Sequence, residues 1–143
     1  MSIEKSNFLH FQPKNKKEVK ININIGMKKL EEKSELTYLG VIIDNKLKFK
    51  EHFNKIYNKA KNGLNGLIMT KNQLNSRAKL NICHSLIHSH FSYCALAWLN
   101  NINKKQLNML KTLQKKAIRI IHGKKYNSHT NELFSKSYKC INY

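Results

Sequence analysis

The sequence is poor in the residues that make loops, and it has no long apolar run. Its 143 residues include one proline and five glycines, which excludes a collagen-like chain, a flexible linker and a proline-rich tail. No stretch approaches the roughly 20 apolar residues that cross a membrane, and the first residues are polar, unlike a signal peptide. We therefore expect a cytoplasmic or nuclear protein of one domain, or one domain with an appendage.

Carboxylates are scarce for a chain of this length. Asp44 is the only aspartate, and Glu31, Glu32 and Glu35 are the nearest approach to an acidic cluster. Two-metal phosphoryl transfer needs several carboxylates that converge on the ions. The chain also lacks a Gly-rich phosphate loop, a nucleophile elbow and a CxxC pair. We therefore expect no catalytic residue, no cofactor and no enzymatic activity of the chain on its own.

Positive charge is in large excess. Lys and Arg number 27 against 8 Asp and Glu, a net charge of +19, and Glu132 is the only acidic residue after residue 51. A compact body with this field attracts polyanions; nucleic acid is the commonest, and an anionic membrane surface is the second choice. AT-rich coding would also favour Lys, Asn and Ile, but it does not explain the depletion of acidic residues.

The first fifty residues have the patterns of short strands. Residues 7–11 are briefly apolar, and residues 19–25 alternate between apolar and polar, which is typical of a half-buried strand. Gly26 supplies a turn, after which residues 27–30 are expected to run back as the next strand. Residues 36–43, rich in β-branched and aromatic side chains, form the strongest predicted strand. The patterns predict a small antiparallel sheet of three or four strands.

The rest of the chain has helical periodicity. It predicts helices over residues 52–70 and 77–98, the second capped by Ser76, and a third helix that begins after Asn103 with Gln106 as its capping-box partner. The first helix is expected to bury Phe53, Ile56, Tyr57, Ala60, Leu64, Leu67 and Ile68. The second is expected to bury Leu80, Cys83, Ile87, His90, Phe91, Cys94 and Trp98. The third is expected to bury Leu107, Leu110, Leu113, Ala117, Ile118 and Ile121.

The predicted fold class is α+β, mainly α, with the small antiparallel sheet followed by a three-helix bundle. We assign the sheet to residues 1–51, the bundle to residues 52–123 and a connector to residues 124–143, with Gly123 as the C-terminal cap of the third helix. One more short helical turn is expected to start at Ser128 or Thr130. A sheet of this size is not stable alone, so its exposed edge and face predict self-association.

One row of basic side chains on the third predicted helix is the best candidate site. Lys104, Lys111, Lys115, Arg119 and His122 follow one another at steps of 7, 4, 4 and 3, which places them on one side of a helix. Such a row would contact phosphates and position a duplex without reading its sequence. The alternative is an ordinary solvated helix face.

A metal site is not expected. His84 and His88 are four residues apart, as in half of a zinc site, but two further ligands are needed. Cys83 and Cys94 would lie about 16 Å apart along one helix, too far to share an ion or form a disulfide. The three cysteines suit a reducing compartment, where two of them would be buried apolar residues.

Four groups of motifs occur in order along the chain. They are Tyr38-Leu39-Gly40-Val41-Ile42-Ile43-Asp44 with Leu47, Phe49 and His52; Ser85-Leu86-Ile87 with Ser89-His90-Phe91, Tyr93-Cys94 and Trp98; Leu113-Gln114-Lys115-Lys116-Ala117-Ile118-Arg119-Ile120-Ile121; and His129-Thr130 with Leu133-Phe134. In this order and spacing they resemble the C-terminal part of reverse transcriptases from non-LTR retrotransposons of the jockey-like type. The resemblance spans nearly the whole chain.

This resemblance implies specific roles. Residues 1–51 would be a residual palm segment whose strand with Tyr38 and Gly40 is the primer grip, although a core strand with a glycine for packing is an equal alternative. Residues 52–123 would be the thumb, and residues 124–143 a truncated connector. The family's catalytic aspartate pair has no counterpart here. The resemblance therefore implies a fragment of an RNA-directed DNA polymerase that binds template–primer without extending it.

The expected partner is thus an RNA–DNA or DNA duplex, contacted at its phosphate backbone. Two other interpretations remain open: a helical module that docks a protein partner, and a relic with no nucleic-acid role. A basic amphipathic binder of anionic membranes is a further reading. We expect no membrane binding, because residues 104–122 have the pattern of a packed bundle helix.

Overall fold

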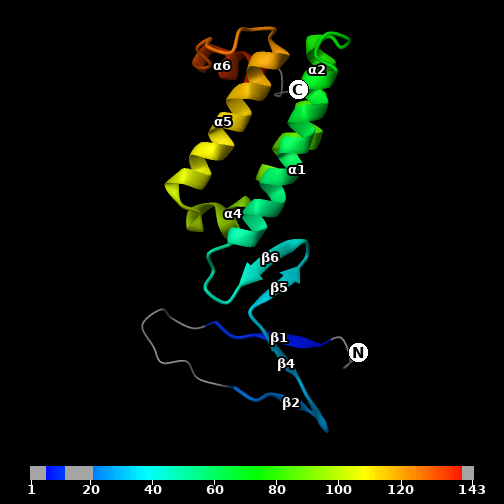
Figure 1. The fold of residues 1–143 in the computed structure, drawn as a ribbon, viewed down its shortest axis with the longest axis vertical. Helices are drawn as coiled ribbons and strands as arrows, with labels where there is room; N and C mark the ends of the chain where they lie inside the picture. The colour runs from blue at the N-terminus through cyan, green and yellow to red at the C-terminus, as the bar shows by residue number, and fades with distance from the viewer. Residues whose placement is uncertain (1–5, 12–20, 140–143) are drawn as a thin grey trace.

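The computed structural model describes residues 6–11 and 21–139, with short strands below a group of helices (Figure 1). The strands are β1 (Asn7–Leu9), β2 (Asn24–Ile25), β3 (Lys28–Lys29), β4 (Glu31–Lys33), β5 (Glu35–Tyr38) and β6 (Val41–Asp44). The helical elements are α1 (Lys50–Met69), α2 (Ser76–Cys83), the π-helical turn η2 (His84–His88), α3 (Ser89–Ser92), α4 (Ala95–Trp98), the 3₁₀ turn η3 (Leu99–Asn101), α5 (Lys104–Ile121) and α6 (Asn131–Lys139). Mixed strands and helices, with helices predominant, confirm the coarse fold class.

The strands form three separate pairs, so the prediction of one antiparallel sheet is wrong. β1 and β4 pair in parallel, whereas β2–β3 and β5–β6 are antiparallel. The alternation over residues 19–25 predicted a half-buried strand, but no layer covers its apolar side. Ile21, Ile23 and Ile25 are each more than a third exposed. Residues 19 and 20 of that predicted strand lie outside the described residues. Uncovered strands of two or three residues do not merge into a larger sheet.

The strongest predicted strand, residues 36–43, is a hairpin instead. β5 and β6 pair from Glu35↔Asp44 to Tyr38↔Val41, and Leu39 and Gly40 form the two-residue turn. Both turn residues have positive φ, 45° and 83°, which matches the right-handed twist of the two strands. Leucine is an unusual residue at a position with positive φ, so the apolar run over residues 36–43 predicted one continuous strand and gave no sign of the turn.

The loop between the hairpin and α1 is built around Asp44. Its Oδ1 accepts the backbone N–H groups of Lys46 and Lys48 at 3.0 and 3.1 Å, and its Oδ2 accepts that of Phe49 at 2.6 Å. Phe49 has φ 52° and is buried. α1 therefore starts at Lys50, two residues earlier than the periodicity predicts.

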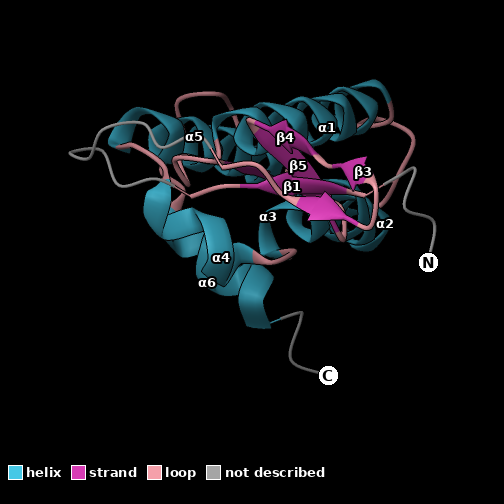
Figure 2. Ribbon diagram, turned by 90° about the horizontal axis from the view of Figure 1, so that it is seen from below, coloured by secondary structure: helices cyan, strands magenta, loops and turns pink. Residues whose placement is uncertain are grey.

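The hydrophobic core lies between α1, the α2–α4 segment and α5. Its largest buried side chains include Phe53, Leu67, Ile87 and Trp98. Figure 2, seen from the end that carries the strands, shows α1 and α5 behind the strands and α6 at one side. The helices predicted to pack together therefore do so. Ile68 was expected in this core but is 43% exposed, so its assignment was wrong.

The second predicted helix is not continuous. Asn75 caps α2 by accepting the backbone N–H of Ala78 at 2.8 Å, so Ser76 is the first helical residue rather than the cap. The chain then passes through η2 and α3 and breaks at Tyr93 and Cys94, where Cys94 has φ 49°. Trp98 stabilises the break, because its Nε1–H donates to the Tyr93 carbonyl at 3.0 Å.

That break also corrects the predicted burial on this helix. Cys94 is exposed, and Leu80, Cys83 and His90 are half-buried rather than fully buried. The break turns Cys94 away from the core, while Phe91 before it and Trp98 after it remain buried.

The third predicted helix is confirmed as α5. The Asn103 side chain accepts the Gln106 backbone N–H, and the Gln106 side chain accepts the Asn103 backbone N–H, so the predicted capping box is present. Leu110, Leu113, Ala117, Ile118 and Ile121 are buried as expected, whereas Leu107 is half-buried.

The end of α5 and the chain after it are close to prediction. Gly123 has φ 61°, as a C-terminal cap requires. The expected short helical turn is a nine-residue helix, α6, which begins just after Thr130 and packs on α5.

Candidate nucleic-acid interface

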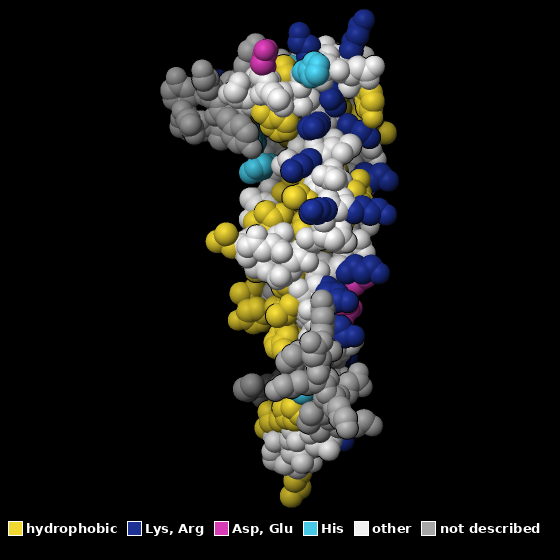
Figure 3. All heavy atoms as spheres, turned by 90° about the vertical axis from the view of Figure 1, so that its left-hand side faces the viewer, with side chains coloured by type: hydrophobic (Ala, Val, Ile, Leu, Met, Phe, Trp, Pro, Cys, Tyr) yellow, Lys and Arg dark blue, Asp and Glu magenta, His cyan; other side chains and the backbone are white. Residues whose placement is uncertain are grey.

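Lysines of the predicted row lie exposed along α5. Lys104, Lys111 and Lys115 are all exposed, while the opposite side of α5 is in the core. Figure 3 shows Lys and Arg side chains gathered in a long column over the helical part of this face, with hydrophobic side chains to one side of it. We call these three residues the α5 lysine row.

Arg119, the fourth residue of the predicted row, holds the loop after α5. Its Nε–H donates to the carbonyl of Ser128 at 3.0 Å, and its guanidinium carbon lies 5.8 Å from the centre of the Tyr126 ring. The side chain is half-buried. Arg119 therefore stabilises the loop after α5, whereas the exposed lysines make no such structural contact in the described residues.

His122, the last residue of the predicted row, contacts α6. Its Nε2 lies 2.9 Å from the Ser137 hydroxyl, and its side chain is half-buried. The contacts of Arg119 and His122 reach 9 and 15 residues along the chain, so helical spacing alone could not reveal them.

Further lysines extend the basic surface beyond the predicted row. Lys105 and Lys116 are exposed on α5, and Lys124 and Lys125 are exposed in the loop that follows it. Sequence analysis missed them because it followed a single line of helical spacing. The density of lysine over residues 104–125 was the available signal.

Acidic residues do not neutralise the α5 lysine row. Two ion pairs are found among the described residues, His10–Glu32 and Lys33–Glu31, and both lie in the strand-rich part. α5 has no acidic residue, and α1 has only Glu51. Neither ion pair involves the row, so its net positive charge favours an anionic partner.

Tyr38 and Gly40 are exposed at the β5–β6 turn. The Tyr93 hydroxyl donates to the Leu39 carbonyl at 2.6 Å, and a Cβ on Gly40 would lie 3.8 Å from the Tyr93 ring. In Figure 1 the hairpin lies beyond the end of the bundle at which α5 begins. The turn and the α5 lysine row are therefore two separate surfaces.

His84 and His88 begin and end η2, which follows directly after Cys83, the last residue of α2. His84 and His88 meet edge to face with ring centres 5.4 Å apart, and burial together with the charge of His88 lowers the pKa of His84. Burial raises the pKa of the Cys83 thiol to about 11, so this sulfur is a poor nucleophile. Within the described ranges, no three His, Cys, Asp or Glu side chains are placed to hold an ion.

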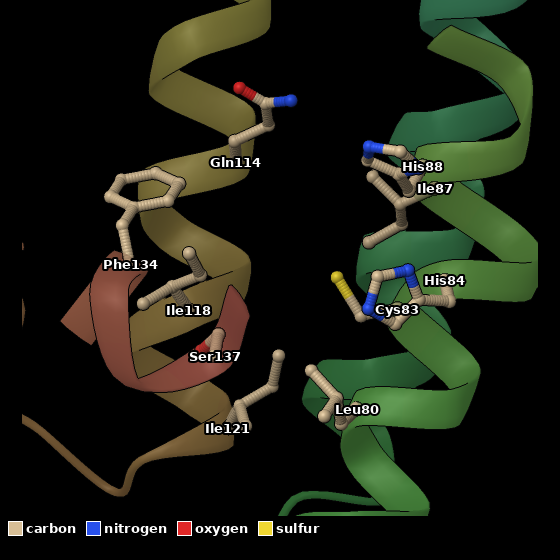
Figure 4. A pocket seen from close by; sticks show the side chains of 10 residues that line it. All are labelled: Leu80, Cys83, His84, Ile87, His88, Gln114, Ile118, Ile121, Phe134 and Ser137. Atoms are coloured by element: carbon tan, nitrogen blue, oxygen red, sulfur yellow. The ribbon is translucent and has the colours of Figure 1, made fainter. Parts of the chain in front are cut away.

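A small hollow separates η2 from α5 and α6 (Figure 4). Apolar side chains supply most of its wall, with Leu80, Ile87, Ile118 and Phe134 among them. Neither Lys nor Arg lines this hollow, so it is not part of the lysine-rich surface.

Comparison with models of known protein families, with curated proteins and with solved structures gives no match. Among the described residues, no helix is both long enough and apolar enough to span a membrane.

Proposed function

We propose that this chain binds nucleic acid through the phosphate backbone, with Lys104, Lys111 and Lys115 on α5 as the central contacts. The observation that carries the proposal is an exposed lysine row on a helix without acidic residues, in a chain of net charge +19. Phosphate contacts of this kind position a protein on a duplex without specifying its sequence.

The length of the row suits a polymer of phosphates. Lys115 follows Lys104 by eleven positions, which corresponds to about 16 Å along a helix. Double-stranded DNA presents about ten phosphate charges over that distance. α5 is also held rigidly, because its other side is packed against α1 and α2. The backbone that carries the row therefore needs no ordering on binding.

A finer proposal concerns the origin of the chain. The order of its motifs supports a segment of a non-LTR retrotransposon reverse transcriptase, with the helices acting as a thumb and the β5–β6 hairpin as the primer grip. The carboxylate of Asp44, the single aspartate, is taken up by three backbone N–H groups. The proposed role is therefore to hold a template–primer duplex, with polymerisation left to residues that this chain does not supply.

Salt-dependent binding tests the proposal. The triple variant Lys104→Ala/Lys111→Ala/Lys115→Ala is expected to weaken binding to RNA–DNA and DNA duplexes and to reduce the log–log salt slope by about 2.5 to 3 for DNA. Fluorescence anisotropy at several salt concentrations measures both quantities. Arg119 is left intact, because its loss would also release the Ser128 carbonyl.

The matched control removes the same charge elsewhere. Lys28, Lys29 and Lys71 are exposed and belong to other parts of the chain than α5, so their triple alanine variant should keep most of the slope. Equal slopes for the two triple variants would contradict the assignment to α5. Flotation with anionic liposomes shows whether a membrane competes as the polyanion.

A further inference from the structure

The basic surface continues from the α5 lysine row toward the side of α5 that packs against α1. An open hollow there is lined by Tyr57 of α1 and by Lys105, Asn108, Met109 and Thr112 of α5. It adjoins the α5 lysine row, because Asn108 follows Lys104 by four residues and precedes Lys111 by three, and it was not among the sites expected from the sequence.

Further lysines occupy the sides of both helices that carry this hollow. On α1, Lys50 precedes Tyr57 by seven residues and Lys61 follows it by four, so all three share one side of the helix. On α5, Lys105 and Lys116 are eleven residues apart, three helical turns, and share the side that carries Asn108 and Thr112. The four lysines are exposed.

The hollow also presents an aromatic ring in a fixed orientation. Tyr57 stacks on Phe53 with ring centres 5.7 Å apart and an angle of 15° between the planes. Phe53 is almost fully buried, so it anchors the half-buried Tyr57 ring. A ring supported in this way offers a surface for stacking at little entropic cost.

Polar groups stand beside the ring. The Asn108 side chain is exposed and can both donate and accept hydrogen bonds. The Thr112 hydroxyl donates to the backbone carbonyl of Asn108 at 2.8 Å, so the lone pairs of the Thr112 hydroxyl oxygen remain available as acceptors. A base edge could therefore be hydrogen-bonded next to the ring.

We propose that the hollow between α1 and α5 binds an unpaired nucleotide strand, with Tyr57 stacking on a base and Lys61, Lys105 and Lys116 contacting phosphates. Aromatic rings set among lysines are the common means by which proteins hold single strands without sequence preference. This inference rests on the proposed function, because it takes nucleic acid as the ligand. It adds a second contact, which would engage single-stranded nucleic acid next to the duplex on the α5 lysine row.

The test uses the full chain and an oligothymidine strand that carries one 2-aminopurine, whose fluorescence is quenched when its ring stacks. Tyr57→Leu is expected to weaken binding of this strand about five- to a hundredfold and to remove the quenching, whereas Tyr57→Phe should retain both. Duplex binding should be nearly unchanged in either variant. Phe11→Leu, which alters an exposed aromatic residue of the strand-rich part, is the control.

A second variant guards against loss of folding. Lys105→Ala/Lys116→Ala changes exposed residues only, and it should reduce the salt slope for the single strand by about 1.4. Unchanged affinity, quenching and slope for the single strand in these variants would overturn the inference while leaving duplex binding intact. Failure of the unaltered chain to bind either nucleic acid would overturn the proposed function itself.

Discussion

At the scale of single residues, Asp44 shows how a motif residue can be structural. Burial raises the pKa of its carboxyl, but the backbone N–H groups of Lys48, Phe49 and Lys46 together outweigh this effect and lower the pKa. The carboxylate therefore favours its charged form and fixes the loop that enters α1. The aspartate that ends the motif is explained by this loop, without any metal.

His52 is the most deeply buried titratable side chain of the junction between the hairpin and the helices. It is 2% exposed, its Nδ1 accepts the Ile42 backbone N–H at 3.4 Å, and its ring meets Trp98 edge to face at 5.6 Å. Its Nε2 has no hydrogen-bond partner in the described part of the chain. A proton on Nδ1 would remove the acceptor for Ile42, so the neutral ring suits this site.

We therefore predict an acid-sensitive free energy of unfolding. Burial, and to a smaller extent the charge of Lys55, lower the pKa of His52 below its usual value of 6.5. The stabilisation from the neutral ring is fully present above the unfolded pKa and is lost as pH falls from about 6.5 toward the folded pKa. Each unit of difference between the two pKa values contributes about 1.4 kcal/mol.

Urea unfolding of His52→Phe between pH 7.5 and pH 5 checks this prediction. The variant keeps an aromatic ring against Trp98 and should show a flatter pH dependence than the unaltered chain. His129→Phe, at an exposed position, serves as the control. An equally steep dependence in His52→Phe would assign the acid sensitivity to other groups.

At the scale of elements, the crossing of α1 and η2 depends on Gly63. A Cβ at this position would lie 2.6 Å from the Leu86 carbonyl oxygen and 2.9 Å from the Leu86 Cβ. At Gly66, one turn further along α1, a Cβ would meet nothing within 4 Å. Two glycines that look alike in the sequence therefore have opposite significance.

We predict opposite effects of alanine at these two glycines. Gly63→Ala should destabilise the chain by about 1–3 kcal/mol, because backbone must move to relieve the overlap. Gly66→Ala should stabilise it by up to about 1 kcal/mol through helix propensity. Thermal and urea unfolding of both variants measure the difference, and similar values for the two would show that α1 and η2 do not cross this closely.

The same scale explains how far the sequence predicts the fold. α5 was predictable because its cap and apolar stripe are local, set by Asn103, Gln106 and the helical period. The β5–β6 turn and the break before α4 were not, because contacts between distant residues support them: Tyr93 reaches Leu39, 54 residues away. Likewise, the exposed lysines of the candidate site could be predicted from local helical spacing. The contacts of Arg119 with Ser128 and of His122 with Ser137 could not, because they depend on how the chain after α5 folds back onto it.

At the scale of the whole molecule, apolar side chains remain uncovered outside the core. Ile21, Ile23 and Ile25 are 37–39% exposed beside the short strands, and Leu96 is 95% exposed near the hairpin end of the bundle. Strand pairs with open edges and exposed apolar residues are prone to pair with other copies. The exposed isoleucines belong to the strand-rich part, whereas Leu96 belongs to α4.

We predict concentration-dependent self-association, measured by sedimentation velocity at several protein concentrations. Ile23→Asn/Ile25→Asn should reduce it, because the exposed apolar side of the strands becomes polar. Met69→Asn, at an exposed apolar residue at the far end of α1, should leave it unchanged. A monodisperse monomer at every concentration would contradict the prediction.

The placement of charge has one more consequence for how this molecule meets a partner. The described acidic residues lie mostly among the strands and at the start of α1, while lysines dominate the length of the helices. The chain is therefore an electric dipole as well as a cation. In the field of a polyanion it experiences a torque before any contact forms, so it arrives with its helices foremost and more of its diffusive encounters become productive.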